Sequence, residues 1–392
     1  MRHALVTEVW PPEIGGSAQL FDSLYGRNFP PGDAVHVIAG GGRRHDELDA
    51  SYPMPVTRFS SERVPWMKPE SARLYADMLA TTLRVCARER VEVLHCGRVI
   101  PEGLVGLAVS RALGIPYTVW VHGEEVSIFM RYAVKKRLMP EVFRGARAVF
   151  ANSSFTLGRA TLAGAPHDKV HVVNPAVDAA RFAGPHDGAA VRARWGVEGR
   201  TVLLTVGRLT RRKGHDKVLD ALASLRATHP DLAWLVLSDG ELEDELKARC
   251  AELGLDGVVR WVGPVKPHEL PAYYAAADLF VHPNRTLDDD DVEGFGMVFL
   301  EASASGVPVI GGRSGGVPDA VQDRVTGLLV DGERWESVAD AIASLASDPE
   351  RRAVMGEAGR QWAKGFSWKR QAAKVRALSE GAAEAPPEHA AP

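Results

Sequence analysis

The stretch Glu293-Gly-Phe-Gly-Met-Val-Phe-Leu-Glu301 places two glutamates eight positions apart, with a Gly-Phe-Gly turn after the first. The apolar residues that follow predict a helix beginning near Gly296. Its first N–H groups would lack partners within the helix and form an anion site that suits a diphosphate. Eight helical residues rise about 12 Å, whereas the carboxylates of a hydrolytic pair lie about 5 to 9.5 Å apart. The spacing therefore favours one carboxylate on a sugar, one on a ribose, and a diphosphate between them.

Further motifs accompany this pair along the 392-residue chain. In order, they are Pro12…Gly15-Gly16, His122-Gly123, Gly207-Arg208-Leu209…Lys213-Gly214, Gly306-Val-Pro308-Val-Ile and Gly315-Gly316-Val-Pro318. The ordered set, which extends from about residue 5 to about residue 375, resembles the retaining, nucleotide-sugar-dependent glycosyltransferases of family four. This resemblance implies the GT-B fold, an α/β architecture in which two Rossmann-like, doubly wound parallel-sheet domains face each other across a cleft. It also implies a C-terminal helix that crosses back to the first domain.

Short apolar runs alternate with helix-length segments, a pattern typical of parallel sheets joined by crossover helices. The predicted strands are His3–Val9, Val35–Ala39, Val91–Cys96, Tyr117–Val121, Ala148–Ala151, Val170–Val173, Thr201–Val206, Trp234–Ser238, Val258–Val262, Leu279–His282, Val307–Ile310 and Gly327–Val330. A stretch rich in Pro, Gly, Asp and Ala interrupts the alternation after the sixth of these strands. We therefore expect an N-terminal acceptor-side domain (1–175), a linker (176–199), a nucleotide-sugar-binding domain (200–365), a crossover helix (366–379) and a disordered tail (380–392).

The expected site residues follow predicted strands, at the carboxyl edge where open parallel sheets bind ligands. The resemblance implies catalytic roles for His122, Arg208, Lys213 and Glu293. It implies donor-binding contacts for Gly15, Gly16, Val265, Leu270, Phe295, Gly296, Met297 and Glu301.

The residue types at these positions suit a transfer reaction. Arg208 and Lys213 carry the charge needed to neutralise a departing diphosphate. Glu293 resembles the carboxylate that grips the donor sugar, and the two oxygens of Glu301 suit two ribose hydroxyls. Because no residue stands out as a covalent nucleophile, we expect front-face transfer in which the leaving phosphate helps to deprotonate the acceptor.

Two other activities on the same architecture stay open. A nucleotide-sugar isomerase or hydrolase would use the same donor site without an acceptor. An NAD-dependent oxidoreductase would need Gly-x-Gly-x-x-Gly after a strand and an acidic residue about 20 positions later, and neither Gly15-Gly16 nor Gly207 has that spacing. Taken in isolation, the basic turn after Gly207 would be a solvated surface turn and His122 a structural histidine. Beside Glu293 the turn is expected in the site, and the resemblance to the family implies the same for His122.

The segment between Pro283 and Glu293 contains four consecutive aspartates, Asp288–Asp291. Its length resembles the relatives that transfer mannose to phosphoinositide lipids, which makes GDP-mannose the first expectation for the donor, although the nucleobase and the sugar stay open. The aspartates lack the alternating spacing of a calcium loop, and GT-B enzymes generally use no metal. We therefore expect a solvated acidic loop and no metal or other cofactor.

The acceptor stays open among a lipid, a polysaccharide and a small molecule. Residues 40–75 lie where such enzymes shape acceptor specificity; their basic and aromatic members include Arg43, Arg44, Arg63, Trp66 and Lys68.

The chain has no visible signal peptide and no apolar stretch approaching the roughly 20 residues of a membrane span. Its three cysteines, Cys86, Cys96 and Cys250, lie far apart, which indicates free thiols in a reducing compartment. We expect a cytoplasmic protein that binds no nucleic acid. Residues 128–147 combine basic and apolar side chains and predict a basic amphipathic helix, which would either lie on the inner membrane face or present a solvated cationic surface.

Overall fold

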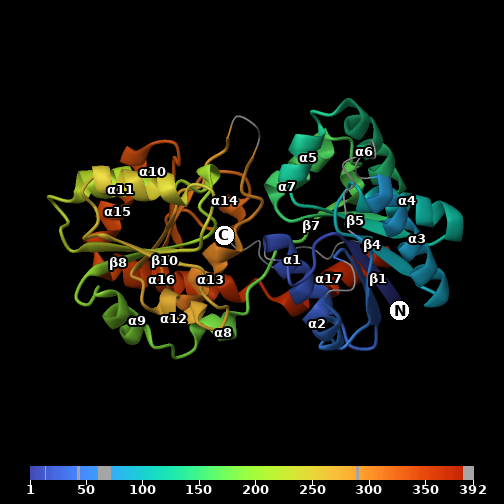
Figure 1. The fold of residues 1–392 in the computed structure, drawn as a ribbon, viewed down its shortest axis with the longest axis horizontal. Coiled ribbons are helices and arrows are strands. Elements are labelled where there is room, and N and C mark those ends of the chain that lie inside the picture. The colour runs from blue at the N-terminus through green and yellow to red at the C-terminus, as the bar shows by residue number, and fades with distance from the viewer. Residues whose placement is uncertain (14, 42–44, 61–71, 288–290, 383–392) are drawn as a thin grey trace. The chain divides into compact units, whose positions relative to one another are not determined.

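The computed structural model describes residues 1–13, 15–41, 45–60, 72–287 and 291–382. The chain forms two compact units (Figure 1): unit 1 consists of Met1–Pro175 and Trp368–Pro392, and unit 2 consists of Ala176–Ser367. Several residues that entered the predictions on the acceptor and the acidic loop lie outside the described part of the chain, as does most of the predicted tail. They are Arg43, Arg44, Arg63, Trp66, Lys68 and Asp288–Asp290.

Unit 1 is built on a seven-stranded parallel sheet with the strand order β3-β2-β1-β4-β5-β6-β7. Its strands are β1 (Arg2–Thr7), β2 (Ala34–Ala39), β3 (Val56–Arg58), β4 (Val93–Cys96), β5 (Tyr117–Val121), β6 (Ala148–Ala151) and β7 (Val170–Val172). Its helices are α1 (Gly16–Phe21), η1 (Asp22–Arg27), α2 (Asp46–Ala50), α3 (Ala72–Arg88), α4 (Glu102–Leu113), α5 (Glu124–Phe129), α6 (Ala133–Gly145), α7 (Ser154–Leu162), η3 (His167–Lys169) and α17 (Trp368–Ser379).

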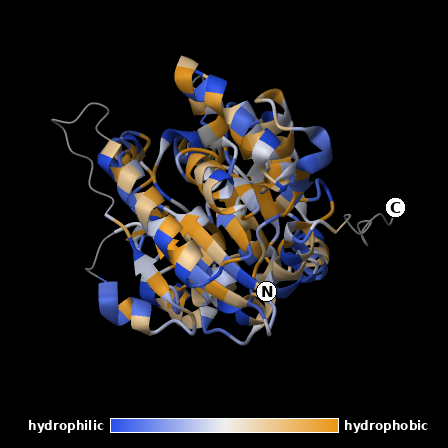
Figure 2. Cartoon of the chain, turned by 90° about the vertical axis from the view of Figure 1, so that its right-hand side faces the viewer, coloured by the Kyte–Doolittle hydropathy of each residue, from blue (hydrophilic) through white to orange (hydrophobic). Residues whose placement is uncertain are grey.

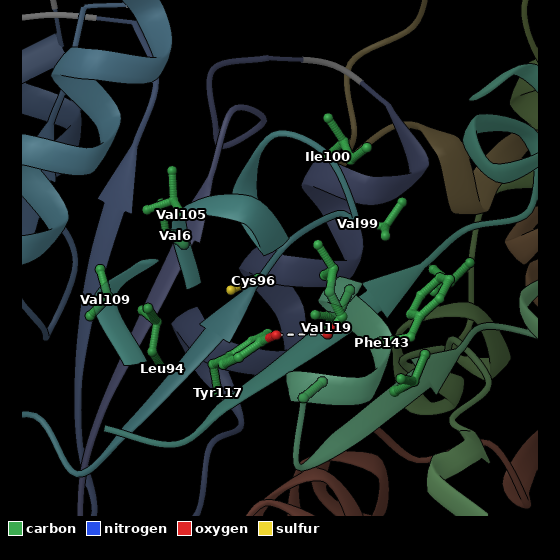
Figure 3. Close-up of a cluster of buried hydrophobic side chains, with 14 of the residues drawn as sticks. Val6, Leu94, Cys96, Val99, Ile100, Val105, Val109, Tyr117, Val119 and Phe143 are labelled. Atoms are coloured by element: carbon green, nitrogen blue, oxygen red, sulfur yellow. Dashed lines mark hydrogen bonds between the residues drawn. The ribbon is translucent and has the colours of Figure 1, made fainter. Parts of the chain in front are cut away.

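The strands of this sheet are mostly apolar because helices cover both faces, as expected for a parallel sheet. Figure 2 shows mainly hydrophobic strands flanked by helices on which hydrophobic and hydrophilic positions alternate. Val6, Leu94 and Val119 of three neighbouring strands pack in one buried cluster with side chains of α4 and α6 (Figure 3). The Tyr117 hydroxyl donates to the Val142 carbonyl at 2.6 Å in the same cluster.

Unit 2 is built on a six-stranded parallel sheet with the strand order β10-β9-β8-β11-β12-β13. Its strands are β8 (Thr201–Val206), β9 (Leu232–Leu237), β10 (Val259–Gly263), β11 (Leu279–His282), β12 (Val309–Gly312) and β13 (Gly327–Val330). Its helices are α8 (Ala179–Ala183), α9 (Gly188–Trp195), η4 (Arg211–Lys213), α10 (His215–Leu225), α11 (Glu243–Glu252), α12 (Leu270–Ala275), α13 (Met297–Ser305), α14 (Val317–Ala320), α15 (Trp335–Ala346) and α16 (Pro349–Lys364).

The segment expected to be a linker, 176–199, is structured and belongs to unit 2. Its two helices each begin at an aspartate that caps the first turn: Asp178 accepts from the Arg181 N–H at 3.1 Å, and Asp187 accepts from the Ala190 N–H at 2.8 Å. Capping aspartates followed by alanines favour short helices, and α8 packs against α12 and α13. These residues are therefore part of the domain rather than a linker.

The C-terminal helix α17 belongs to unit 1, as the predicted crossover requires. Arg376 on this helix forms an ion pair with Asp33 at 2.5 Å, and Arg147 donates to the Ser379 carbonyl at 2.8 Å. Both contacts join the end of the chain to the first sheet.

The single basic helix predicted over 128–147 is wrong in one respect, because the segment contains two helices. The backbone is extended at Tyr132 (φ −101°, ψ 113°), which separates α5 from α6. α6 buries Met139, Val142 and Phe143 against the core. No helix among the described residues is long and apolar enough to cross a membrane. The three cysteines are free and buried.

Candidate active site

The turn after β8 is shaped by two glycines. At Gly207 the backbone has a φ of 153°, and a Cβ there would lie 2.9 Å from the His282 ring. At Gly214 the φ is 73°, and a Cβ would lie 2.3 Å from the Pro283 carbonyl oxygen. The turn can therefore pack closely against the end of β11 only because both positions lack side chains. Arg208, which follows Gly207, is exposed, and its side chain has no hydrogen-bond or ion-pair partner within the described residues.

The Glu293 carboxylate in unit 2 binds two cationic side chains and one amide. Its Oε2 accepts hydrogen bonds from Lys213 Nζ, from Arg212 Nη1 at 2.8 Å and from Asn284 Nδ2 at 2.9 Å. Arg212 Nε also contacts Asp291 Oδ1 at 3.1 Å. Burial by itself would raise the pKa of Glu293, but the charges of Lys213 and Arg212 outweigh burial and lower that pKa to about 2. Glu293 is thus ionised at neutral pH.

Helix α13 starts three residues after Glu293, at the N-cap Gly296. Gly296 has a φ of 89°, and a Cβ there would lie 2.5 Å from the Phe299 ring, so the position requires glycine. Phe295 is buried against Phe366 with the ring centroids 6.0 Å apart, which anchors the turn that precedes the helix. The backbone N–H groups at the start of α13, from Met297 onward, therefore lie close in sequence to the ionised carboxylate.

Glu301 lies further along α13 and has a different neighbour. Its Oε2 accepts a hydrogen bond from the Tyr274 hydroxyl of α12 at 2.8 Å. Val265 and Leu270, the residues expected near the nucleobase, are half-buried on the connection from β10 into α12. The predicted donor residues of unit 2 thus come from the turn after β8, the connection after β10 and the segment after β11.

In unit 1, His122 follows β5, and its Nε2 lies 3.0 Å from the Gly97 carbonyl oxygen. A carbonyl can only accept, so this bond places the proton of the neutral ring on Nε2. Burial, with a smaller contribution from Arg98, lowers the pKa of His122 to about 4, so the ring is neutral at pH 7. The Phe21 ring of α1 packs edge-on against His122, with the centroids 5.6 Å apart.

The glycine loop of unit 1 leads into the same helix. Gly15 and Gly16 are exposed at the start of α1, and a Cβ at Gly15 would meet nothing within 4 Å. Because α1 also carries the phenylalanine that contacts His122, the structure brings the glycine loop and the histidine to one region of unit 1.

Three residues of the unit 2 arrangement carry no assigned role in the sequence-based prediction: Arg212, Asn284 and Tyr274. Arg212 is one of several cations in the basic turn, and nothing in the sequence separates it from Arg211. Asn284 and Tyr274 reach the glutamates only through the folding of the sheet and α12. Within the described residues, no three His, Cys, Asp or Glu side chains gather as they would to hold a metal ion; the expectation of no metal stays a prediction.

Comparison with known proteins assigns this arrangement to the two-domain glycosyltransferases. Residues 16–181 match the model of Glycosyltransferase Family 4, and residues 189–362 match the model of Glycosyl transferases group 1. The chain is 33% identical over 384 residues to a GDP-mannose-dependent alpha-(1-6)-phosphatidylinositol monomannoside mannosyltransferase of Mycolicibacterium smegmatis. That alignment covers 97% of this chain and 99% of the relative. The chain therefore belongs to this family of glycosyltransferases and is a transferase enzyme.

Two further matches support the family and the fold. A D-inositol 3-phosphate glycosyltransferase of Arthrobacter sp. (strain FB24) is 33% identical over 364 residues, which cover 88% of this chain and 79% of that protein. The structure of Anabaena HepE in complex with UDP matches with a TM-score of 0.82 at 21% identity, covering 97% of this chain and 100% of the other. The predicted family and GT-B fold are thus confirmed, and neither the isomerase or hydrolase nor the oxidoreductase alternative is favoured.

Proposed function

We propose that this chain is a retaining mannosyltransferase that takes mannose from GDP-mannose and transfers it to a hydroxyl of an acceptor containing an inositol phosphate. The observation that carries the proposal is the ionised Glu293, held by Lys213, Arg212 and Asn284 three residues before the N-cap of α13. A fixed carboxylate suits sugar hydroxyls, and the adjacent helix N-terminus and cations suit a diphosphate.

The donor and acceptor classes are supported by the relatives. The Mycolicibacterium smegmatis relative is named as GDP-mannose-dependent and as acting on phosphatidylinositol monomannoside. The Arthrobacter relative is named for D-inositol 3-phosphate. An inositol that carries a phosphate is the chemistry that these two acceptors share.

In the proposed reaction, the bond between the anomeric carbon and the diphosphate oxygen breaks, and a bond to the acceptor oxygen forms on the same face of the sugar. The acceptor proton passes to the leaving diphosphate oxygen. Arg208, exposed at the turn after β8, and Lys213 would offset the charge that develops on the diphosphate. Glu293 is a weak nucleophile because its pKa is about 2 and its Oε2 already accepts three hydrogen bonds. Its role is therefore to hold the sugar rather than to form a covalent intermediate.

The first test is a calorimetric binding panel of GDP, UDP, ADP and their sugar forms without added metal. We expect GDP and GDP-mannose to bind most tightly, and the variants Arg208→Ala and Glu301→Ala to lose most of that affinity. Arg211→Ala is the matched control, because this neighbouring arginine is exposed and its guanidinium lies 3.6 Å from the carboxylate of the exposed Glu245. Stabilisation by a nicotinamide cofactor in place of any nucleoside diphosphate would overturn the proposal.

The second test is turnover with GDP-mannose and three acceptors: inositol phosphate, phosphatidylinositol and its monomannoside. Proton NMR of the product should show an α-mannoside, the anomeric configuration of the donor. Consumption of GDP-mannose at full rate without any acceptor would instead support a hydrolase or isomerase.

We propose peripheral membrane contact for the basic surface at the start of α6. Tyr132 and Val134 are 56% and 71% exposed there, and Lys136 and Arg137 are exposed beside them. Apolar and cationic side chains on one exposed surface suit an anionic bilayer. Sedimentation with vesicles containing phosphatidylinositol should decrease in a Tyr132→Ser, Val134→Ser variant. Equal sedimentation of this variant would contradict the contact.

A further inference from the structure

The hydroxyl of Tyr274 is directed at the carboxylate of Glu301. It donates to Glu301 Oε2 at 2.8 Å and lies 3.4 Å from the Val298 carbonyl oxygen. Tyr274 is wholly buried (0% exposed), whereas Glu301 keeps 6% of its surface accessible. Because Tyr274 has no accessible surface, a ligand cannot touch it directly, and the hydrogen bond to Glu301 is the route by which the tyrosine would act on a ligand.

The Tyr274 ring is fixed from two sides. The Phe182 ring of α8 packs edge-on against it with the centroids 5.5 Å apart, and the Phe280 ring of β11 lies at 5.7 Å. α8 belongs to the segment that the sequence indicated as a linker, so this helix supports the residue behind the carboxylate. Burial, followed by the charge of Glu301, raises the pKa of Tyr274 well above its ordinary value. The hydroxyl therefore remains a donor at every pH at which the protein would be assayed.

We propose that Tyr274 is a positioning residue that sets the preference of this enzyme for ribonucleotides over 2′-deoxyribonucleotides. The inference rests on the proposed role of Glu301 in holding the ribose hydroxyls. A carboxylate has two oxygens, and a ribose presents two neighbouring hydroxyls that can each donate to it. Bidentate binding needs the carboxylate plane to face the ribose.

The hydrogen bond from Tyr274 fixes that plane. The last torsion of a glutamate side chain is broad and roughly two-fold, so an untethered carboxylate samples many orientations. A buried donor on Oε2 selects one orientation before the nucleotide arrives, which reduces the entropy lost on binding. Without the donor, the Glu301 carboxylate is held less firmly, and a ligand that uses both hydroxyls loses more than one that has a single hydroxyl. The tyrosine therefore changes the preference for the ribonucleotide over the 2′-deoxyribonucleotide more than it changes the affinity for both.

The test measures the dissociation constants of GDP and 2′-deoxy-GDP by calorimetry, with UDP and 2′-deoxy-UDP alongside. The variants are Tyr274→Phe, which removes one oxygen and keeps the ring, and Tyr273→Phe, its buried neighbour on α12. Glu301→Gln is measured in parallel. For the unmodified protein we expect a ribose preference of tenfold or more. Tyr274→Phe should reduce that preference about tenfold, through weaker binding of the ribonucleotide, because hydrogen bonds to charged groups typically contribute that much. Tyr273→Phe should leave the preference unchanged.

The outcomes separate this inference from the proposed function. If Tyr274→Phe weakens both nucleotides equally, the tyrosine is only structural and the inference is wrong, while the donor site stands. If Glu301→Gln keeps the full ribose preference, both the ribose role of Glu301 and the inference are wrong. If neither nucleotide pair binds the unmodified protein, the proposed function fails and the inference fails with it. A thermal melt of each variant, compared with that of the unmodified protein, excludes misfolding as the cause.

Discussion

Two carboxyl groups, one in each unit, lie beyond the carboxyl end of a parallel sheet but differ in protonation. In unit 1, Glu102 at the start of α4 is wholly buried and accepts from the Glu8 N–H at 3.0 Å, and burial raises its pKa to about 7. In unit 2, Glu293 also experiences burial, but Lys213 and Arg212 lower its pKa to about 2. The comparison shows that a position at the edge of the sheet does not decide the charge of a carboxyl group. Its cationic neighbours do.

The same contrast extends to the other site residues of the two units. His122 in unit 1 is neutral at pH 7 because its pKa is about 4. Unit 2 concentrates fixed charge instead, with the Glu293 network and an exposed Arg208. Charged groups suit a diphosphate donor, whereas neutral hydrogen-bonding groups suit the hydroxyl of an acceptor.

The largest expected effect comes from removing the charge of Glu293 while keeping its shape. Glu293→Gln should lower kcat about 10³-fold, or about 4 kcal/mol, because the sugar loses a fixed acceptor and the amide repels the donors around it. GDP binding should persist, since the diphosphate contacts come from other groups. Steady-state kinetics and calorimetry on one preparation measure both quantities.

Glu245→Gln is the control for the Glu293 variant, because Glu245 is exposed and its carboxylate forms a loose pair with Arg211. Near-normal turnover of Glu293→Gln would remove the ionised carboxylate from the mechanism. The difference in ionisation between Glu102 and Glu293 would then have no consequence for catalysis.

The next effect concerns pH and the stability of unit 1. The pKa of Glu102 is higher in the folded protein (about 7) than its ordinary value of 4.5. Between these values the folded state binds more protons than the unfolded state, so stability falls as pH rises. Replacing Glu102 with neutral Gln should therefore stabilise the protein by up to about 3 kcal/mol at pH 8 and by almost nothing at pH 4. Urea unfolding at the two pH values measures the difference.

Glu293 gives the opposite pH dependence of stability. Its lowered pKa contributes stability that is present above pH 4.5 and is lost as pH falls toward 2. A Glu102→Gln variant with the same pH dependence as the unmodified protein would show that folding does not raise the pKa of Glu102.

The strands were well predicted from the sequence, and the contacts of the site were not. Continuous apolar runs located twelve of the thirteen strands in the described part of the chain, because strands buried on both faces leave a strong signal. The missed strand β3 has only three residues, all half-buried at the edge of the sheet. The two glutamates and the basic turn proposed to bind the diphosphate could be recognised because their chemistry and spacing lie along the chain.

The partners of these residues could not be found in the same way. Asn284 reaches Glu293 although the two residues lie nine positions apart in the sequence, and Tyr274 reaches Glu301 from a separate helix. Such contacts depend on how β11, α12 and α13 pack. The capping aspartates before α8 and α9 were visible in the sequence, but the surrounding Pro and Gly outweighed them in the prediction of a linker.

The smallest effect separates two adjacent arginines that the sequence alone does not distinguish. Arg212 bridges Glu293 at 2.8 Å and Asp291 at 3.1 Å, whereas Arg211 is exposed and lies 3.6 Å from the exposed Glu245. Arg212→Gln should lower kcat/KM roughly thirtyfold, which corresponds to about 2 kcal/mol of lost transition-state stabilisation. The reason is the loss of a half-buried charge-assisted hydrogen bond. Arg211→Gln should change kcat/KM by less than about twofold, since exposed ion pairs contribute little. If the two variants lose activity equally, net positive charge at the turn matters rather than the geometry around Glu293. Unit 2 would then bind its donor by charge alone.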